Sequence, residues 1–212
     1  MSGVLLHQRP APSGLAHQPR RRRRLARAVT EVLAPTVVTS ALLVAVGWHS
    51  AATAPDALGW ALVAVLFAAV VPLFYILRGV RRRRLTDHHV RLREQRPAPL
   101  LVGVVSVLVG LALLARGGAP RDLVALVGAM SVGLLASLLV TLAWKVSIHT
   151  AVVAGAVVVL ILVFGPALVV FAPAVALVAW ARVEVGDHTA PQTLAGAVLG
   201  GSIAAVFFSL LR

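Results

Sequence analysis

The chain has 212 residues, of which 59% are hydrophobic, and its mean hydropathy is +0.93. A soluble domain has about 45–50% apolar residues, so this composition excludes an ordinary soluble protein and indicates helices that face lipid. The net charge of +13 could suggest nucleic acid, but the Arg residues flank apolar segments, where membrane topology alone places them. We therefore expect no nucleic-acid partner. The absence of cysteine excludes disulfides and thiolate metal sites.

The first 28 residues differ from the rest of the chain. Residues 1–28 are rich in Pro, Gln and Arg and show no apolar period. We expect a disordered, basic, cytoplasmic tail, followed by a single transmembrane domain over 29–212.

Seven apolar segments follow the tail, and a spanning helix needs about 17–25 residues. Residues 149–181 are too long for one crossing, and Gly165 and Pro166 break them, because Pro lacks a backbone donor and Gly permits a turn. The sequence therefore predicts an all-α, polytopic membrane bundle of seven helices, or six if 149–181 is re-entrant. The expected helices are 31–50, 57–78, 99–116, 121–144, 147–164, 166–181 and 190–211.

Proline and glycine inside these segments have structural interpretations. A proline kink in a membrane helix is tolerable where neighbouring groups satisfy the freed carbonyl. Glycines in the last helix favour close helix packing. The prolines are Pro35, Pro72 and Pro173, and the glycines are Gly196, Gly200 and Gly201.

Basic residues are distributed unequally between the two ends of the predicted bundle. With seven crossings, 17 of the 20 Lys and Arg residues fall on the side of the N-terminus. The positive-inside rule predicts that this side is cytoplasmic in a multi-pass protein of the cell membrane. The Arg runs at 20–24 and 81–84 set topology in this interpretation; alternatively, they recruit anionic lipid headgroups.

Three polar stretches precede helices that begin on this same side: 87–100, 144–152 and 181–193. Helix N-termini expose unpaired N–H groups and a partial positive charge, so each is a potential anion site. Ser147 and Thr189 are the expected N-caps, with Pro191 in the first turn of the last helix.

If these three starts converge, their cations would surround one negatively charged group. Arg96, Lys145 and Arg182 would bind it, and His149 and His188 would be the titratable groups beside it. Such a set suits a phosphate held by Arg, with His available for proton transfer or nucleophilic attack.

The same stretches resemble a known family. They read "HVRLREQRP" (89–97), "VSIH" (146–149) and "ARVEVGDHTAPQ" (181–192). In this order they resemble the motifs K-x6-R-P, P-S-G-H and S-R-x5-H-x3-D of the type 2 phosphatidic acid phosphatase family, which is related to vanadium-dependent haloperoxidases. The resemblance covers about residues 57–211. It implies a helical membrane phosphatase for a lipid phosphate, such as a polyprenyl phosphate or diphosphate, without a metal or other cofactor.

The resemblance also implies roles for individual residues. Arg96 and Arg182 would bind phosphate oxygens, and Ser147 would add a hydroxyl or backbone contact. His188 would be the nucleophile that becomes phosphorylated, and His149 the acid that protonates the leaving oxygen.

Five substitutions depart from the family pattern. Val146 replaces Pro and Ala181 replaces Ser, and the other three bear directly on the phosphate chemistry. His89 stands where Lys is expected and would contact phosphate only when protonated. Ile148 replaces Gly and adds bulk near the phosphate. Gln192 replaces the Asp that would orient the nucleophilic His, and it brings no charge. In serine proteases a comparable loss costs about 10⁴ in rate.

The same residues bear on other possible functions. His88 and His89 are adjacent and would point in different directions on a helix, and no second cluster in the sequence supports them, so we expect no metal. A prenyltransferase would need paired Asp-rich motifs, which a chain with seven acidic residues lacks. The alternatives left open are a non-hydrolytic relative that binds or transfers a prenyl diphosphate, and a structural or transport-like membrane protein. The sequence leaves the oligomeric state open.

Overall fold

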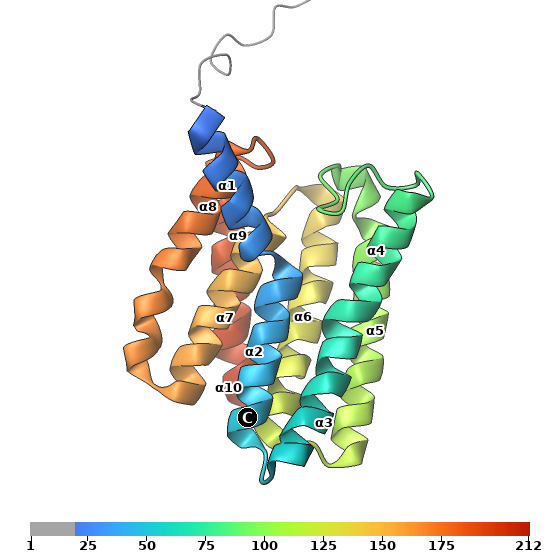
Figure 1. Cartoon of the computed structure of the whole chain (residues 1–212), viewed down its shortest axis with the longest axis vertical. Helices are drawn as coiled ribbons and strands as arrows, with labels where there is room; N and C mark the ends of the chain where they lie inside the picture. The colour runs from blue at the N-terminus through green and yellow to red at the C-terminus, as the bar shows by residue number, and fades with distance from the viewer. Residues whose placement is uncertain (1–19) are drawn as a thin grey trace, which may run out of the picture.

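The computed structural model describes residues 20–212, and over that range it is a bundle of helices without strands (Figure 1). The expected all-α fold is confirmed. The α-helices are α1 (Arg20–Val32), α2 (Pro35–Ser50), α3 (Ala54–Val65), α4 (Val71–Arg81), α5 (Pro97–Gly117), α6 (Arg121–Ala143), α7 (Ile148–Phe164), α8 (Pro173–Glu184), α9 (Ala190–Ile203) and α10 (Ser209–Leu211). Shorter elements are the π-helical turns η2 (Leu66–Val70) and η5 (Ala204–Phe208) and the 3-10 turns η3 (Arg93–Gln95) and η4 (Pro166–Phe171).

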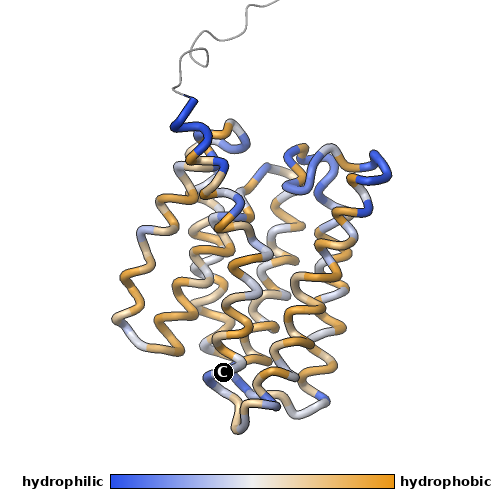
Figure 2. The backbone as a smooth tube through the Cα atoms, viewed as in Figure 1, coloured by the Kyte–Doolittle hydropathy of each residue, from blue (hydrophilic) through white to orange (hydrophobic). Residues whose placement is uncertain are grey.

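Several helices are long and apolar enough to cross a membrane. Within residues 20–212, five meet this condition by length and composition, or six if the bent pair α1 and α2 is one span. The apolar α7, with 17 residues, is shorter. Hydrophobic residues run along the bundle, and hydrophilic residues concentrate at one end (Figure 2). Leu62, Leu108 and Leu139 are among the large apolar side chains on the outer surface, as a multi-pass membrane protein requires.

The N-terminal part of the described chain differs from the expected tail. Helix α1 begins at Arg20, so residues 20–28 are helical rather than irregular, while residues 1–19 lie outside the described range. Ala26 of α1 is fully buried and packs with Ala181 and Val185. The apolar contact with α8 explains why an Arg-rich stretch is helical here.

Proline positions are accommodated as expected. The α1–α2 bend of 41° precedes Pro35, the first residue of α2. Pro72 follows the π-helical turn η2, and the Ser106 hydroxyl of α5 donates a hydrogen bond to the Phe67 carbonyl at 2.6 Å. In a π-turn the residue five positions later would bond this carbonyl, and that residue is Pro72, which has no N–H.

Close packing of α7 against α9 depends on two glycines. A Cβ at Gly200 would collide with the backbone of Ala151, and one at Gly196 would collide with the Ser147 carbonyl. A Cβ at Gly201 would meet the Ala154 Cβ at an ordinary 4.0 Å. The expected packing role is therefore confirmed for Gly196 and Gly200 and is not required at Gly201.

The polar segments meet at one end of the bundle (Figure 1). Helix α1, the connection from α4 to α5, the turn from α6 to α7 and the turn from α8 to α9 all lie there. The alternation of helices thus collects the three polar helix starts, as the sequence predicted.

Candidate functional site

Arg96 is the N-cap residue of α5, and its side chain is buried although it carries a charge. Its Nε donates to the Val90 carbonyl at 2.9 Å, and its Nη1 donates to the Val146 carbonyl at 2.8 Å. Its Nη2 lies 3.2 Å from Nε2 of His188. One guanidinium therefore joins the 82–96 connection, the α6–α7 turn and the α8–α9 turn.

His188 is a buried imidazole whose neutral form is favoured. Burial is the largest cause that lowers its pKa to about 2, followed by the positive charges of Arg182, Arg96 and Lys145, while the Val146 backbone acts in the opposite direction. The imidazole is therefore uncharged at neutral pH. Since Arg96 can only donate, Nε2 of His188 is the acceptor, which places the ring proton on Nδ1. Within residues 20–212, Nδ1 has no hydrogen-bond partner.

Arg182, in the last turn of α8, is fully buried. Its Nη2 lies 2.9 Å from Oδ2 of Asp187. The other carboxylate oxygen of Asp187, Oδ1, lies 3.2 Å from Nε of Arg91. The approach to Asp187 is close but not aligned as a hydrogen bond, and none of the three guanidinium nitrogens has an aligned acceptor among the described residues. A buried cation with unused donors has free capacity for an anion.

The turn between α6 and α7 is tied to the turn before α9. Ser147 caps α7, as expected, by accepting the Thr150 N–H at 3.4 Å, and its own N–H donates to the Gln192 carbonyl. Lys145 donates to the Asp187 carbonyl at 2.6 Å, and burial lowers its pKa. Lys145 and Ser147 therefore hold the two turns together.

Gln192 does not orient His188, which corrects the role expected for it. Its side-chain oxygen accepts the Thr189 N–H at 3.1 Å. A residue three positions after the N-cap is in the right place to reach back to the cap backbone, and this local bond occupies the Gln192 oxygen. The Thr189 N-cap and Pro191 in the first turn are as the sequence predicted.

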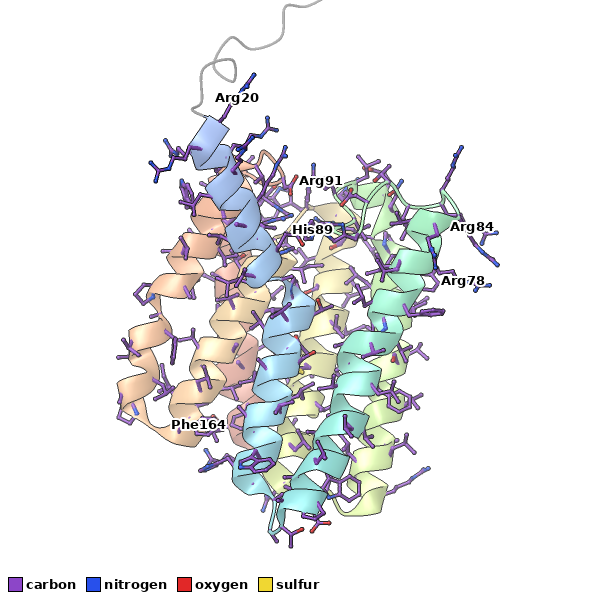
Figure 3. The ribbon with its side chains drawn as sticks, viewed as in Figure 1. Arg20, Arg78, Arg84, His89, Arg91 and Phe164 are labelled. Atoms are coloured by element: carbon purple, nitrogen blue, oxygen red, sulfur yellow. The ribbon has the colours of Figure 1, made fainter. Side chains whose placement is uncertain are left out.

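His89 lies beside α1, where its side chain contacts Glu31 (Figure 3). Its Nε2 is 2.9 Å from a Glu31 carboxylate oxygen. Burial is the largest cause that lowers its pKa, and Glu31 opposes the shift. The His89 side chain is therefore engaged with Glu31, and its neutral form is favoured.

His149 connects this group to an apolar cavity of about 290 Å³. Its side chain is buried, its ring lies edge-on to His89 with centroids 5.2 Å apart, and its Nε2 lacks a partner among the described residues. His149 and Arg96 both line the cavity, which extends between the helices to Val159. The ten residue-to-residue steps from His149 to Val159 span about 15 Å of helix, about half of a hydrocarbon core.

The predicted site residues thus fall into two connected groups. Arg182, His188, Lys145 and Ser147 form the inner group, and His149 and His89 line the cavity. Arg96 belongs to both groups.

The sequence alone assigned no role to Asp187, Glu31 or Arg91. The position of Asp187 next to His188 was the one available signal, whereas Glu31 lies 58 residues from His89.

No family model, curated protein or solved structure matches the chain.

Proposed function

We propose that this chain is a membrane lipid-phosphate phosphatase that acts through a phosphohistidine at His188. The observation that carries the proposal is the contact of Arg96 with Nε2 of His188 at the polar end of an apolar cavity. A phosphoryl group placed between these two side chains would take both the hydrogen bonds of the Arg and the lone pair of the His.

Three features support an anionic headgroup at this place. Arg182 contributes a second buried guanidinium with unused donors. Burial and the positive charges of Arg182, Arg96 and Lys145 lower the pKa of His188 and so favour its neutral form. The cavity beyond Arg96 and His149 is lined mainly by apolar side chains, so a lipid tail would lie between the helices while its phosphate remains at the polar end.

The reaction would proceed in two steps. Nε2 of His188 attacks phosphorus, and the bond from phosphorus to the lipid oxygen breaks. His149, in the imidazolium form that a bound anionic headgroup would favour, gives one ring proton to that oxygen and becomes neutral. Water then attacks the phosphohistidine and returns a proton to His149, which releases inorganic phosphate and free His188. Arg96 and Arg182 would stabilise the charge on the transferring phosphoryl oxygens in both steps.

A second function, binding of a lipid phosphate or diphosphate without hydrolysis, is favoured by one observation. Nδ1 of His188 has no carboxylate acceptor in the described chain, and Gln192 is engaged at the cap of α9. A ring that becomes positive during attack would then lack the charge stabilisation that an Asp provides.

Release of phosphate from a radiolabelled polyprenyl phosphate by the purified protein separates these functions. We expect release by the wild-type protein and its loss in His188→Ala. The matched control is His49→Ala, which changes an exposed His in the last turn of α2 and should leave release unchanged. Lipid binding without release, equal in wild type and His188→Ala, would support the binding function instead. Unchanged lipid affinity in Arg182→Ala would contradict both functions.

A further inference from the structure

A cluster of metal-ligating side chains stands beside the proposed phosphate site. Glu31, His88 and His89 each offer one ligand atom, and these atoms all lie within 4.8 Å of one another. Nε2 of His89 is 2.9 Å and Nε2 of His88 is 3.4 Å from the same oxygen of Glu31. The two imidazoles therefore converge on one carboxylate, although they are neighbours in the chain.

The local backbone explains this convergence. The 82–92 connection is not helical at the two histidines, so their side chains do not diverge as they would on a helix. Asp87 accepts the His89 N–H at 2.8 Å, and Val90 adopts φ of +46°. A β-branched residue with positive φ is a genuine outlier and costs free energy. Arg96 holds this conformation by bonding the Val90 carbonyl.

We propose that Glu31, His88 and His89 form a binding site for a divalent transition metal ion such as Zn²⁺. Two imidazoles and one carboxylate are a known zinc ligand set that keeps a position open for water or substrate. Ligand atoms around tetrahedral Zn²⁺ are about 3.3–3.5 Å apart, as follows from bonds of roughly 2.0–2.1 Å. The 3.4 Å separation between His88 and Glu31 matches this spacing, and the 2.9 Å separation between His89 and Glu31 is a few tenths of an ångström shorter. Glu31 and His88 are both about half-exposed, so their side chains can adjust around an ion.

The place of the cluster gives the ion a role. Both histidines line the cavity, whereas Glu31 belongs to the last turn of α1, just before the bend to α2. A bound ion would therefore fasten α1 to the 82–92 connection at the polar end of the cavity. This site does not depend on the proposed phosphatase activity, and its test is independent of lipid turnover.

The test is Zn²⁺ titration of the purified full-length protein by calorimetry, followed by Co²⁺ substitution and visible absorption. We expect one Zn²⁺ per chain and a tetrahedral Co²⁺ spectrum. Removing a ligand should weaken binding about tenfold or more, since even outer-shell losses cost 10–100-fold. Glu31→Gln and His88→Gln are suitable because both side chains are substantially exposed and their loss should leave the bundle folded, as circular dichroism can confirm.

Matched controls distinguish this cluster from other zinc-binding residues. His49→Gln and the pair His7→Gln with His17→Gln remove histidines elsewhere in the sequence and should leave Zn²⁺ affinity unchanged. No Zn²⁺ binding by the wild-type protein would overturn the proposal. So would equal affinity in wild type and Glu31→Gln.

Discussion

Replacement of Gly200 by Ala tests the packing that joins two of the polar turns. A Cβ at Gly200 would lie 2.7 Å from the Ala151 Cα and closer still to its carbonyl. Carbon atoms in contact are about 3.5–4.0 Å apart, so α7 and α9 would have to separate by about 1 Å. The obstructing atoms are backbone and cannot rotate away. Overpacking costs about 1–3 kcal/mol, and we expect the upper part of this range because a rigid helix must move.

The expected result is a lower melting temperature for Gly200→Ala, measured by thermal unfolding in detergent. At roughly 2–4 °C per kcal/mol for a chain of this size, the decrease should be about 5–10 °C. Gly201→Ala is the matched control, because its Cβ meets Ala154 at an ordinary 4.0 Å and Ala gains about 0.5–1 kcal/mol over Gly in a helix. Equal melting temperatures for the two variants would refute the close approach of α7 and α9.

Three further predictions concern charge and orientation. The pKa of His188 is about 2 in the folded state, against an ordinary 6.5, so the unfolded state binds more protons between these two pH values. The free energy of unfolding should therefore fall as pH decreases below 6.5, by about 2 kcal/mol at pH 5. In denaturant titrations, His188→Gln should lack this part of the pH-dependent loss. Asp187→Asn leaves the buried Arg182 without its carboxylate partner and should lower the free energy of unfolding by about 3–5 kcal/mol. Vanadate should then raise the melting temperature of this variant more than that of the wild-type protein. Equal shifts in the two proteins would argue against an oxyanion pocket at Arg182. If the polar end is cytoplasmic, Ala190→Cys should resist an impermeant thiol reagent in intact cells while Ala52→Cys reacts, and the reverse pattern would show the opposite orientation.

Much of the helical architecture could be predicted because it depends on local composition. Apolar length set the helices, and Gly165 and Pro166 set the break after α7, where Gly165 has φ of +105°. The start of α1 could not be predicted this way, since its helical state depends on burial of Ala26 against α8.

The candidate site was likewise only partly predictable from the sequence. Arg96 and His188 were predicted to meet because their segments begin helices at the same end, and the structure brings them within 3.2 Å. The role predicted for Gln192 was wrong, because its side-chain oxygen accepts the local Thr189 N–H instead of contacting His188. Glu31 and His89 are 58 residues apart in the sequence, and no sequence pattern indicates that their side chains are in contact.

The sequence by itself determined an all-helical bundle with its basic residues at one end. Each apolar stretch sets one helix by its own length, and consecutive helices alternate in direction, so neither feature requires knowledge of tertiary contacts. Only the tertiary structure decided which side chains share that end. The bend at Pro35, the Gly196 and Gly200 contacts and the non-helical turn at His88 and His89 fix distances between segments that are remote in sequence, and those distances determine which charges pair and which donors remain free.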